Sequence, residues 1–462
     1  MGGALFLFPD VALIIPLAHV VGDSYLAYLI LTGVFICLFL VSTLRLGTTL
    51  FENKAYLGLG WVLSFFFIIS HPFLWPSVAD FWHVLYHPIV HGGAYLLILA
   101  GLLIVPSYLQ KKNFWLLLVL GFLVLAGTIS DLLFLVYFTL PSLVALTLLA
   151  WREPTQRPQS GHLLTCIMLS SLLARLLRPF LDPGKNAEAD YISKTGLLTA
   201  WDTIFRMISD LIDRQHLPFI GFSLLSLLAT FFWGLHVLRI IRSQNNWHGP
   251  TFYLKMSLIL SVACGWGALL FSGNYVDPAS WRYLVFPSAL SLIFALWLLS
   301  CSLPRFWGYL GLVLCLGLCL SQGLKPPRLE RPYLELVQKL DAITSDPSWI
   351  VLGDYWTARK STFQSRQGLR VEAICSDGSV YHWANSWKPY LRIGADPNQT
   401  VLVVMDRLDT EEIRTNYGAP HEEWTFGTHL IYRYNPPHTE TLFRRIRDSL
   451  APLVTAEAKK QP

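Results

Sequence analysis

The sequence predicts an α-helical polytopic membrane protein of about ten transmembrane helices, followed by a soluble α/β domain at the C-terminal end. Of its 462 residues, 53% are hydrophobic and 14% charged, with a mean hydropathy of +0.47, whereas soluble domains carry roughly 25% charged residues. The charges are also unevenly distributed, with 18 Lys/Arg and 13 Asp/Glu in residues 1–325 and 17 of each in residues 326–462. We therefore expect a multi-span membrane domain over 1–325 and a soluble domain over 326–462.

The membrane domain contains about ten apolar stretches, each close to the roughly 20 residues that a helix needs to cross a bilayer. Asp131 interrupts the longest stretch and predicts a tight hairpin there, because a lone carboxylate at mid-bilayer costs several kcal/mol. The predicted spans are 25–44, 56–74, 89–109, 113–130, 132–151, 161–178, 217–238, 252–272, 283–303 and 306–323.

Lysines and arginines set the predicted orientation of these spans. When the loops are assigned alternately to the two sides, one side receives ten basic residues in short loops and only two acids, Glu52 and Glu153. Basic loops stay in the cytoplasm, so we expect a multi-pass protein of the inner (plasma) membrane with its N-terminus and C-terminal domain on the outer, periplasmic face. The net charge of +5 lies wholly in the membrane domain. It reflects this topology and predicts no binding to nucleic acid.

The first 24 residues contain no Lys or Arg and so lack the charged start of a signal peptide. Asp10 follows Pro9 in an otherwise apolar segment, and the apolar stretch 11–21 is too short to span a bilayer. The pattern predicts an outer loop with an interfacial helix. Because a chain that begins outside is unusual without a helix to deliver it, we expect one upstream helix to be missing.

Three arginines lie at the outer ends of predicted spans, against the positive-inside trend. Arg175 and Arg178 end the sixth span, and Arg282 begins the ninth. Each needs an anionic partner, and the fork of guanidinium donors matches the oxygens of a phosphate. A structural ion pair with an outer acid such as Asp277 is the alternative. Because three arginines lie on one face, phosphate binding and structural ion pairs are equally favoured, and both alternatives stay open.

A row of polar side chains precedes the third span, with Asp80, His83, His87 and His91 at positions i, i+3, i+7 and i+11. On one helix this spacing stacks possible metal ligands on a single face, but Pro88 interrupts the helix. The pattern therefore favours a polar lining of an outer cavity, with a divalent metal as the weaker alternative.

Single carboxylates near the membrane plane are functional candidates, and the chain has two, Asp10 and Asp131. A helix-capping role is the strong alternative for Asp131, which lies at the predicted turn. In the largest outer loop, 179–216, the apolar positions from Leu198 to Ile212 favour an amphipathic helix. That helix would either roof a cavity in the interface plane or pack between spans.

The soluble domain alternates strands with helices, which predicts a small α/β sandwich. Nothing in it resembles a phosphate-binding Gly-rich loop or a catalytic triad. Aromatic residues between Tyr355 and Tyr390 look exposed, and packing against the membrane explains them better than sugar stacking. Cys375 is the only cysteine in this domain, so neither an internal disulfide nor structural zinc is expected. The predicted elements are helix 330–345, strands 349–352, 369–374 and 401–405, helix 410–417, strand 428–434 and helix 442–450.

The organisation resembles the GT-C superfamily of polytopic glycosyltransferases, which includes protein O-mannosyltransferases and lipid A aminoarabinose transferases. Three elements carry the resemblance: Phe8-Pro9-Asp10 in the first outer loop, Asp80 with His83 in the next, and Trp281-Arg282-Tyr283 with Pro287 at a late span. The organisation of the whole membrane domain is similar to that superfamily, but the sequence motifs are similar only at these residues. The chain departs from the pattern in having no Asp-Glu pair after Asp10 and no Asp-x-Asp.

The resemblance implies transfer of a sugar from a polyprenyl-phosphate donor to a glycan, lipid or protein acceptor on the outer face, with inversion. Asp10 would be the base, with Asp80 in reserve. Arg282 would stabilise the leaving phosphate with Arg175 and Arg178, so that no cofactor is needed. A transporter is the alternative, although the inverted repeats it predicts are not evident. A non-catalytic envelope-assembly protein is a second alternative, favoured by the absent acids.

Overall fold

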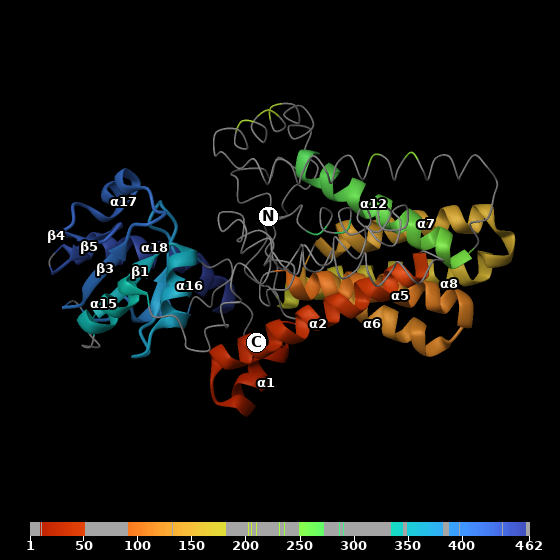
Figure 1. The fold of residues 1–462 in the computed structure, drawn as a ribbon. Helices are drawn as coiled ribbons and strands as arrows, with labels where there is room; N and C mark the ends of the chain where they lie inside the picture. The colour runs from red at the N-terminus through yellow and green to blue at the C-terminus, as the bar shows by residue number, and fades with distance from the viewer. Residues whose placement is uncertain are drawn as a thin grey trace. The chain divides into compact units, whose positions relative to one another are not determined.

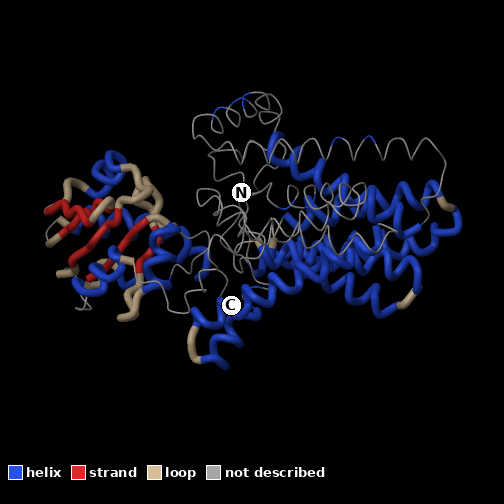
Figure 2. Tube along the Cα trace, viewed as in Figure 1, coloured by secondary structure: helices blue, strands red, loops and turns tan. Residues whose placement is uncertain are grey.

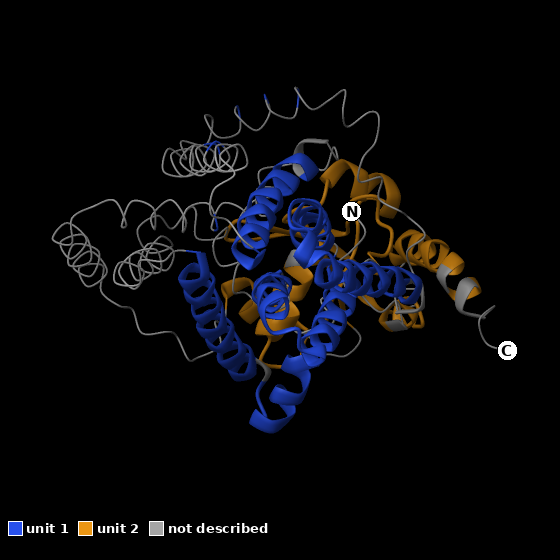
Figure 3. Cartoon of the chain, turned by 90° about the vertical axis from the view of Figure 1, so that its right-hand side faces the viewer, with its two compact units in different colours: residues 1–183, 187–326 blue, residues 184–186, 327–462 orange. Residues whose placement is uncertain are grey.

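In a computed structural model the chain forms two compact units, residues 1–183 with 187–326 and residues 184–186 with 327–462 (Figure 3). The amphipathic helix predicted within 179–216 and the spans predicted over 56–74, 217–238, 283–303 and 306–323 lie outside the described residues, apart from single positions. The structure describes Asp10, residues 12–50, 91–131, 133–181, 249–271, 334–344, 349–381, 388–396, 398–436 and 438–458, and single positions 202, 205, 209, 231, 235, 286 and 290.

The first unit is helical in its described part (Figures 1 and 2). Among the residues that the structure describes, five helices are long and apolar enough to cross a membrane, and α6 is a shorter apolar helix of 17 residues. Six of the ten predicted spans coincide with these helices. The elements are α1 (Ala12–Val21), α2 (Ser24–Leu50), α5 (Gly92–Lys111), α6 (Phe114–Ser130), η4 (Leu135–Thr139), α7 (Leu140–Arg152), η5 (Pro154–Gln156), α8 (Arg157–Leu181) and α12 (Gly249–Phe271).

Local chemistry explains where these helices end. Lys112 adopts the left-handed conformation (φ 52°) and closes α5, and the side chain of Asn113 accepts a hydrogen bond from the Trp115 backbone at 2.9 Å to begin α6. α1 is apolar and has no fully buried residue, and its Ile14 and Leu17 pack partly against the helical core.

Two glycines let the helices of the first unit approach closely. A Cβ added to Gly101 would lie 2.5 Å from the Phe138 ring, and one added to Gly127 would lie 2.5 Å from the Phe134 ring. The two phenylalanine rings are 5.0 Å apart and fully buried. Small residues at such contacts are typical of helices that pack in a membrane. The segment around η4, a π-helix that carries Phe138, is thereby fixed against α5 and α6.

The second unit is a three-layer α/β sandwich around a five-stranded sheet of order β2-β1-β3-β5-β4. β1 pairs in parallel with β2 and β3, and β5 is antiparallel to β3 and β4. One face packs on α15 and α16, the other on α17 and α18. The elements are α15 (Glu335–Ile343), β1 (Trp349–Gly353), α16 (Tyr355–Gln364), β2 (Val371–Ala373), η7 (Lys388–Arg392), β3 (Thr400–Val404), α17 (Thr410–Tyr417), β4 (Glu422–Phe426), β5 (His429–Tyr434) and α18 (Thr439–Ala458).

The predicted elements of this unit are all present, but the sequence patterns missed α16 and β4. α16 is mostly polar with a weak apolar face, and β4 is an edge strand whose residues alternate between half-buried and exposed. Tyr390 corrects a prediction, because it is fully buried and its hydroxyl donates to the carbonyl of Ala373 at 2.5 Å.

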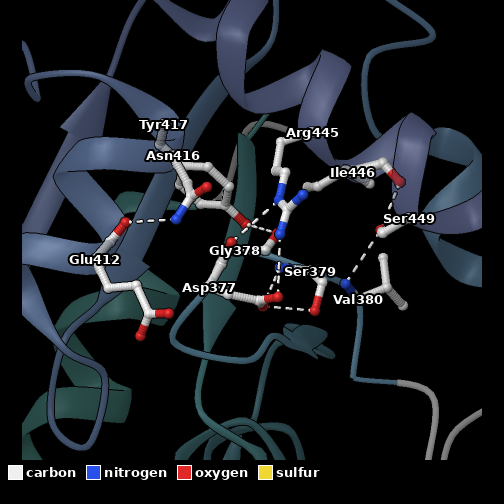
Figure 4. Close-up of polar contacts among 10 residues, drawn as sticks. All are labelled: Asp377, Gly378, Ser379, Val380, Glu412, Asn416, Tyr417, Arg445, Ile446 and Ser449. Carbon is white, nitrogen blue, oxygen red and sulfur yellow. Dashed lines mark hydrogen bonds and ion pairs between the residues drawn. The ribbon is translucent and has the colours of Figure 1, made fainter.

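The loop after β2 is tied to α17 and α18 (Figure 4). The Arg445 guanidinium donates to the Asp377 carboxylate at 3.0 Å and to its carbonyl at 3.1 Å. Gly378 has φ +74°, and a Cβ there would lie 2.5 Å from the Tyr417 ring, so only glycine fits. Burial raises the pKa of Tyr417 well above its usual value, and the protonated hydroxyl donates to the Gly378 carbonyl at 2.8 Å.

Candidate functional site in the helical unit

A histidine and an aspartate form a buried polar pair among the apolar helices. The Nδ1 atom of His91 lies 2.5 Å from Oδ2 of Asp131, and the side chains are only 8% and 5% exposed. This hydrogen bond between Nδ1 and the carboxylate fixes the orientation of the imidazole ring.

The local sequence explains how the pair is held. His91 immediately precedes α5, and Asp131 ends α6, so the two side chains meet although they are 40 residues apart. The second carboxylate oxygen of Asp131 accepts from the backbone nitrogen of Leu133 at 3.0 Å, which caps the next helix. The break between two helices that was predicted at Asp131 is confirmed, and the carboxylate both caps the next helix and orients the imidazole.

A cluster of three aromatic rings begins beside His91. The ring of Tyr95 lies 6.1 Å from that of His91 and stacks on Phe286 at 4.7 Å with an interplanar angle of 5°. Tyr137 of η4 lies 5.7 Å from Phe286. All three aromatic side chains are fully buried. Phe286 belongs to the Trp281–Pro287 segment, which carries part of the resemblance.

The two ends of the helical unit differ in charge. The end of α5 meets the start of α8 through Tyr108 and His162, 3.0 Å apart. Glu153, which follows α7, accepts from the backbone of Gly249, the first residue of α12, at 2.9 Å. This end carries the described basic loop residues, Lys111, Lys112, Arg152 and Arg157. The His91–Asp131 pair lies at the opposite ends of α5 and α6.

The predicted phosphate-binding arginines of α8 lie at the same end of the unit as the pair. α8 has 25 residues and begins at the basic end, so its length of about 37 Å brings Arg175 and Arg178 to the other end. Arg175 is exposed and Arg178 half-buried. The predicted Asp80, His83, His87 and Arg282 lie outside the described residues.

The remaining predicted carboxylate, Asp10, is 2% exposed just before α1. Within the described ranges, no group of three or more His, Cys, Asp or Glu side chains could hold a metal ion.

We did not predict from the sequence that His91 pairs with Asp131, although each residue was a candidate by itself. Their positions could have predicted the pair, because the two residues lie at the same end of two predicted spans that follow one another in the sequence.

No family model, curated protein or solved structure matches this chain.

Proposed function

We propose that the helical unit is a membrane glycosyltransferase that moves a sugar from a polyprenyl-phosphate donor to an acceptor hydroxyl. The observation that carries the proposal is the buried His91–Asp131 pair at 2.5 Å, at the end of the unit opposite its basic loops. An imidazole oriented by a carboxylate is suited to remove a proton from a hydroxyl.

The reaction balances with the groups that we assign to it. The His91 imidazole takes the proton of the acceptor hydroxyl, whose oxygen forms a bond to C1 of the sugar. The bond between C1 and the phosphate oxygen breaks, and polyprenyl phosphate leaves with both electrons of that bond. Arg175 and Arg178, with Arg282 from the sequence, neutralise the charge that develops on the phosphate. Attack from the face opposite the leaving group inverts the anomeric carbon.

Asp10 competes with His91 for the role of base. The resemblance favours Asp10, whereas the orientation by Asp131 favours His91. The soluble unit would lie on the outer face with the reaction, as the charge asymmetry of the loops indicates.

Release of polyprenyl phosphate tests the proposal, because it is the common product whichever sugar is moved. Protein reconstituted in liposomes receives polyprenyl-phosphate mannose, glucose, N-acetylglucosamine or aminoarabinose with a mixed lipid and glycan acceptor fraction. We expect release with at least one donor, and a loss of at least about a hundredfold in His91→Gln, the scale of general-base catalysis. No release with any donor would contradict the proposal and favour a transporter or an assembly protein.

Two further variants assign the roles. Asp131→Asn keeps an acceptor for the Leu133 backbone but not the charge beside His91, so we expect reduced release from a protein that still melts cooperatively. If Asp10→Asn abolishes release while His91→Gln does not, Asp10 is the base.

Native mass spectrometry tests the phosphate site separately. We expect an adduct with polyprenyl phosphate that the double variant Arg175→Ala/Arg178→Ala weakens. The matched control is Lys111→Ala/Lys112→Ala, which removes two charges from the opposite end and is expected to leave the adduct unchanged.

A further inference from the structure

The sheet of the second unit has a topological switch point. From β1 the chain passes into α16, whose Ala358 packs on one face of the sheet. From β3 it passes into α17, whose Ile413 and Tyr417 pack on the other face. β1 and β3 are adjacent and parallel, with Gly353 opposite Val404 at their ends. In open α/β sheets ligands bind at the carboxyl ends of strands, where the connections diverge in this way.

Polar side chains from three elements meet at this point. The Nδ1 atom of His429, at the start of β5, lies 2.8 and 2.9 Å from the two carboxylate oxygens of Asp406, which follows β3. The hydroxyl of Thr357 on α16 lies 3.5 Å from the same carboxylate. The side chains of His429 and Asp406 are 34% and 20% exposed, so this cluster is open to solvent.

Two tyrosines continue the same edge of the sheet. Tyr355 begins α16, and the Tyr381 backbone nitrogen donates to the carbonyl of Ala373, the last residue of β2, at 3.0 Å. The two rings lie 5.1 Å apart and are both half-buried. The Arg359 guanidinium lies 5.7 Å from the Tyr355 ring.

These residues follow the order of the strands along the edge. Tyr381 lies beside β2, Tyr355 after β1, Asp406 after β3 and His429 on β5. Four neighbouring strands span about 14 Å at the usual spacing of about 4.8 Å. We call Tyr381, Tyr355, Thr357, Asp406 and His429 the edge row. A row of this length suits an extended ligand better than a single small ring.

The chemistry of the edge row fits sugars. Tyr355 and Tyr381 pack partly against the core beside α15 and α16, and the part of each ring that stays exposed offers apolar surface for the C–H face of a sugar. A carboxylate, an imidazole and a hydroxyl together can accept from and donate to neighbouring hydroxyl groups. A second carboxylate, Asp354, follows β1, is 7% exposed and accepts from the backbone nitrogen of Thr357 at 3.3 Å. The Asp406 carboxylate disfavours an anion beside it by charge repulsion, whereas Arg359 places a positive charge at the Tyr355 end of the row. With charges of both signs, the row as a whole suits a neutral ligand.

We propose that the edge row binds a neutral oligosaccharide chain. Such a chain would be the acceptor or product of the transfer proposed above, and in that respect the inference rests on the proposed function. Binding is a separate property of the second unit, and it can be measured with no donor present.

The test is calorimetric titration of the full chain in lipid nanodiscs, which avoids sugar-based detergents. The probes are maltohexaose, isomaltohexaose, mannohexaose and chitohexaose, each compared with its monosaccharide. We expect at least one hexasaccharide to bind with a Kd of about 1 mM or tighter, and its monosaccharide to bind at least about tenfold more weakly because it contacts only part of the row.

Matched variants locate the site. Asp406→Asn and Tyr355→Ala are each expected to raise the Kd at least about tenfold. The controls are Glu411→Gln, an exposed carboxylate on α17, and Phe363→Ala, an aromatic residue near the other end of α16, which leave the Kd unchanged.

Failure to bind any probe, or equal binding by the wild type and both edge-row variants, would overturn the inference. The two proposals fail separately. Release of polyprenyl phosphate without oligosaccharide binding contradicts only the edge row, and binding without release contradicts only the transferase.

Discussion

Asp131 illustrates how a single carboxylate is accommodated in the helical unit. Its two oxygens have different partners, the Leu133 backbone at 3.0 Å and the His91 ring at 2.5 Å. A buried charge is costly unless it is paired and hydrogen-bonded, and this residue is both. The capping role expected from its place at a turn and the functional role expected from its burial are therefore compatible, because each uses a different oxygen.

Asp377 in the soluble unit predicts a measurable dependence of stability on pH. Burial would raise the pKa of this carboxyl, but hydrogen bonds from Ser379 and the Arg445 guanidinium outweigh it and hold the pKa below its usual value. The ionised form is thus favoured in the folded state, so the stabilisation is present above a pH of about 4 and is lost as the pH falls below it.

We expect Asp377→Asn to destabilise the protein by about 0.5–1 kcal/mol at pH 7, since the ion pair is partly exposed and screened. The melting temperature of the full chain, compared between wild type and variant from pH 7 to pH 3, checks this. Glu411→Gln serves as the control. A difference that stays constant down to pH 3 would show that ionisation of Asp377 is not the cause.

At the scale of elements, the glycine contacts decide how closely the helices of the first unit pack. Gly127 lies one turn before Asp131, and the Phe134 ring fills the space that a side chain would need. Because interiors are closely packed, an added methyl group there must displace the ring.

Gly127→Ala is therefore expected to destabilise the helical unit by about 1–3 kcal/mol, the cost of overpacking. Gly161→Ala on α8 is the matched control, since a Cβ there meets no atom within 4 Å. It should be neutral or slightly stabilising, because alanine favours a helix by up to about 1 kcal/mol over glycine. Thermal unfolding of both variants in one detergent provides the comparison. Equal melting temperatures would mean that the Phe134 ring moves aside at little cost.

For the whole molecule, the charge asymmetry predicts which parts of the chain face the cytoplasm. Asn113, in the turn between α5 and α6, lies at the basic end of the helical unit, and Asp396 lies on the exposed surface of the soluble unit. Basic loops remain in the cytoplasm, so these two positions are expected on opposite sides of the membrane.

Single cysteines at these positions, in a background without other cysteines, test the topology. We expect a membrane-impermeant maleimide to label Asp396→Cys in spheroplasts and to label Asn113→Cys only after permeabilisation. Labelling of both in intact spheroplasts, or the reverse pattern, would contradict the predicted orientation and move the proposed reaction to the other face.

The sequence by itself determined the described apolar helices, the helix break at Asp131 and the alternation of strands and helices in the soluble unit. These are local features, set by the length of apolar runs and by the spacing of apolar residues. Only the tertiary structure decided that His91 meets Asp131 and that His429 meets Asp406, because each pair joins residues from different elements. It also revealed α16, whose weakly patterned residues become helical where the sheet supplies a surface to pack on.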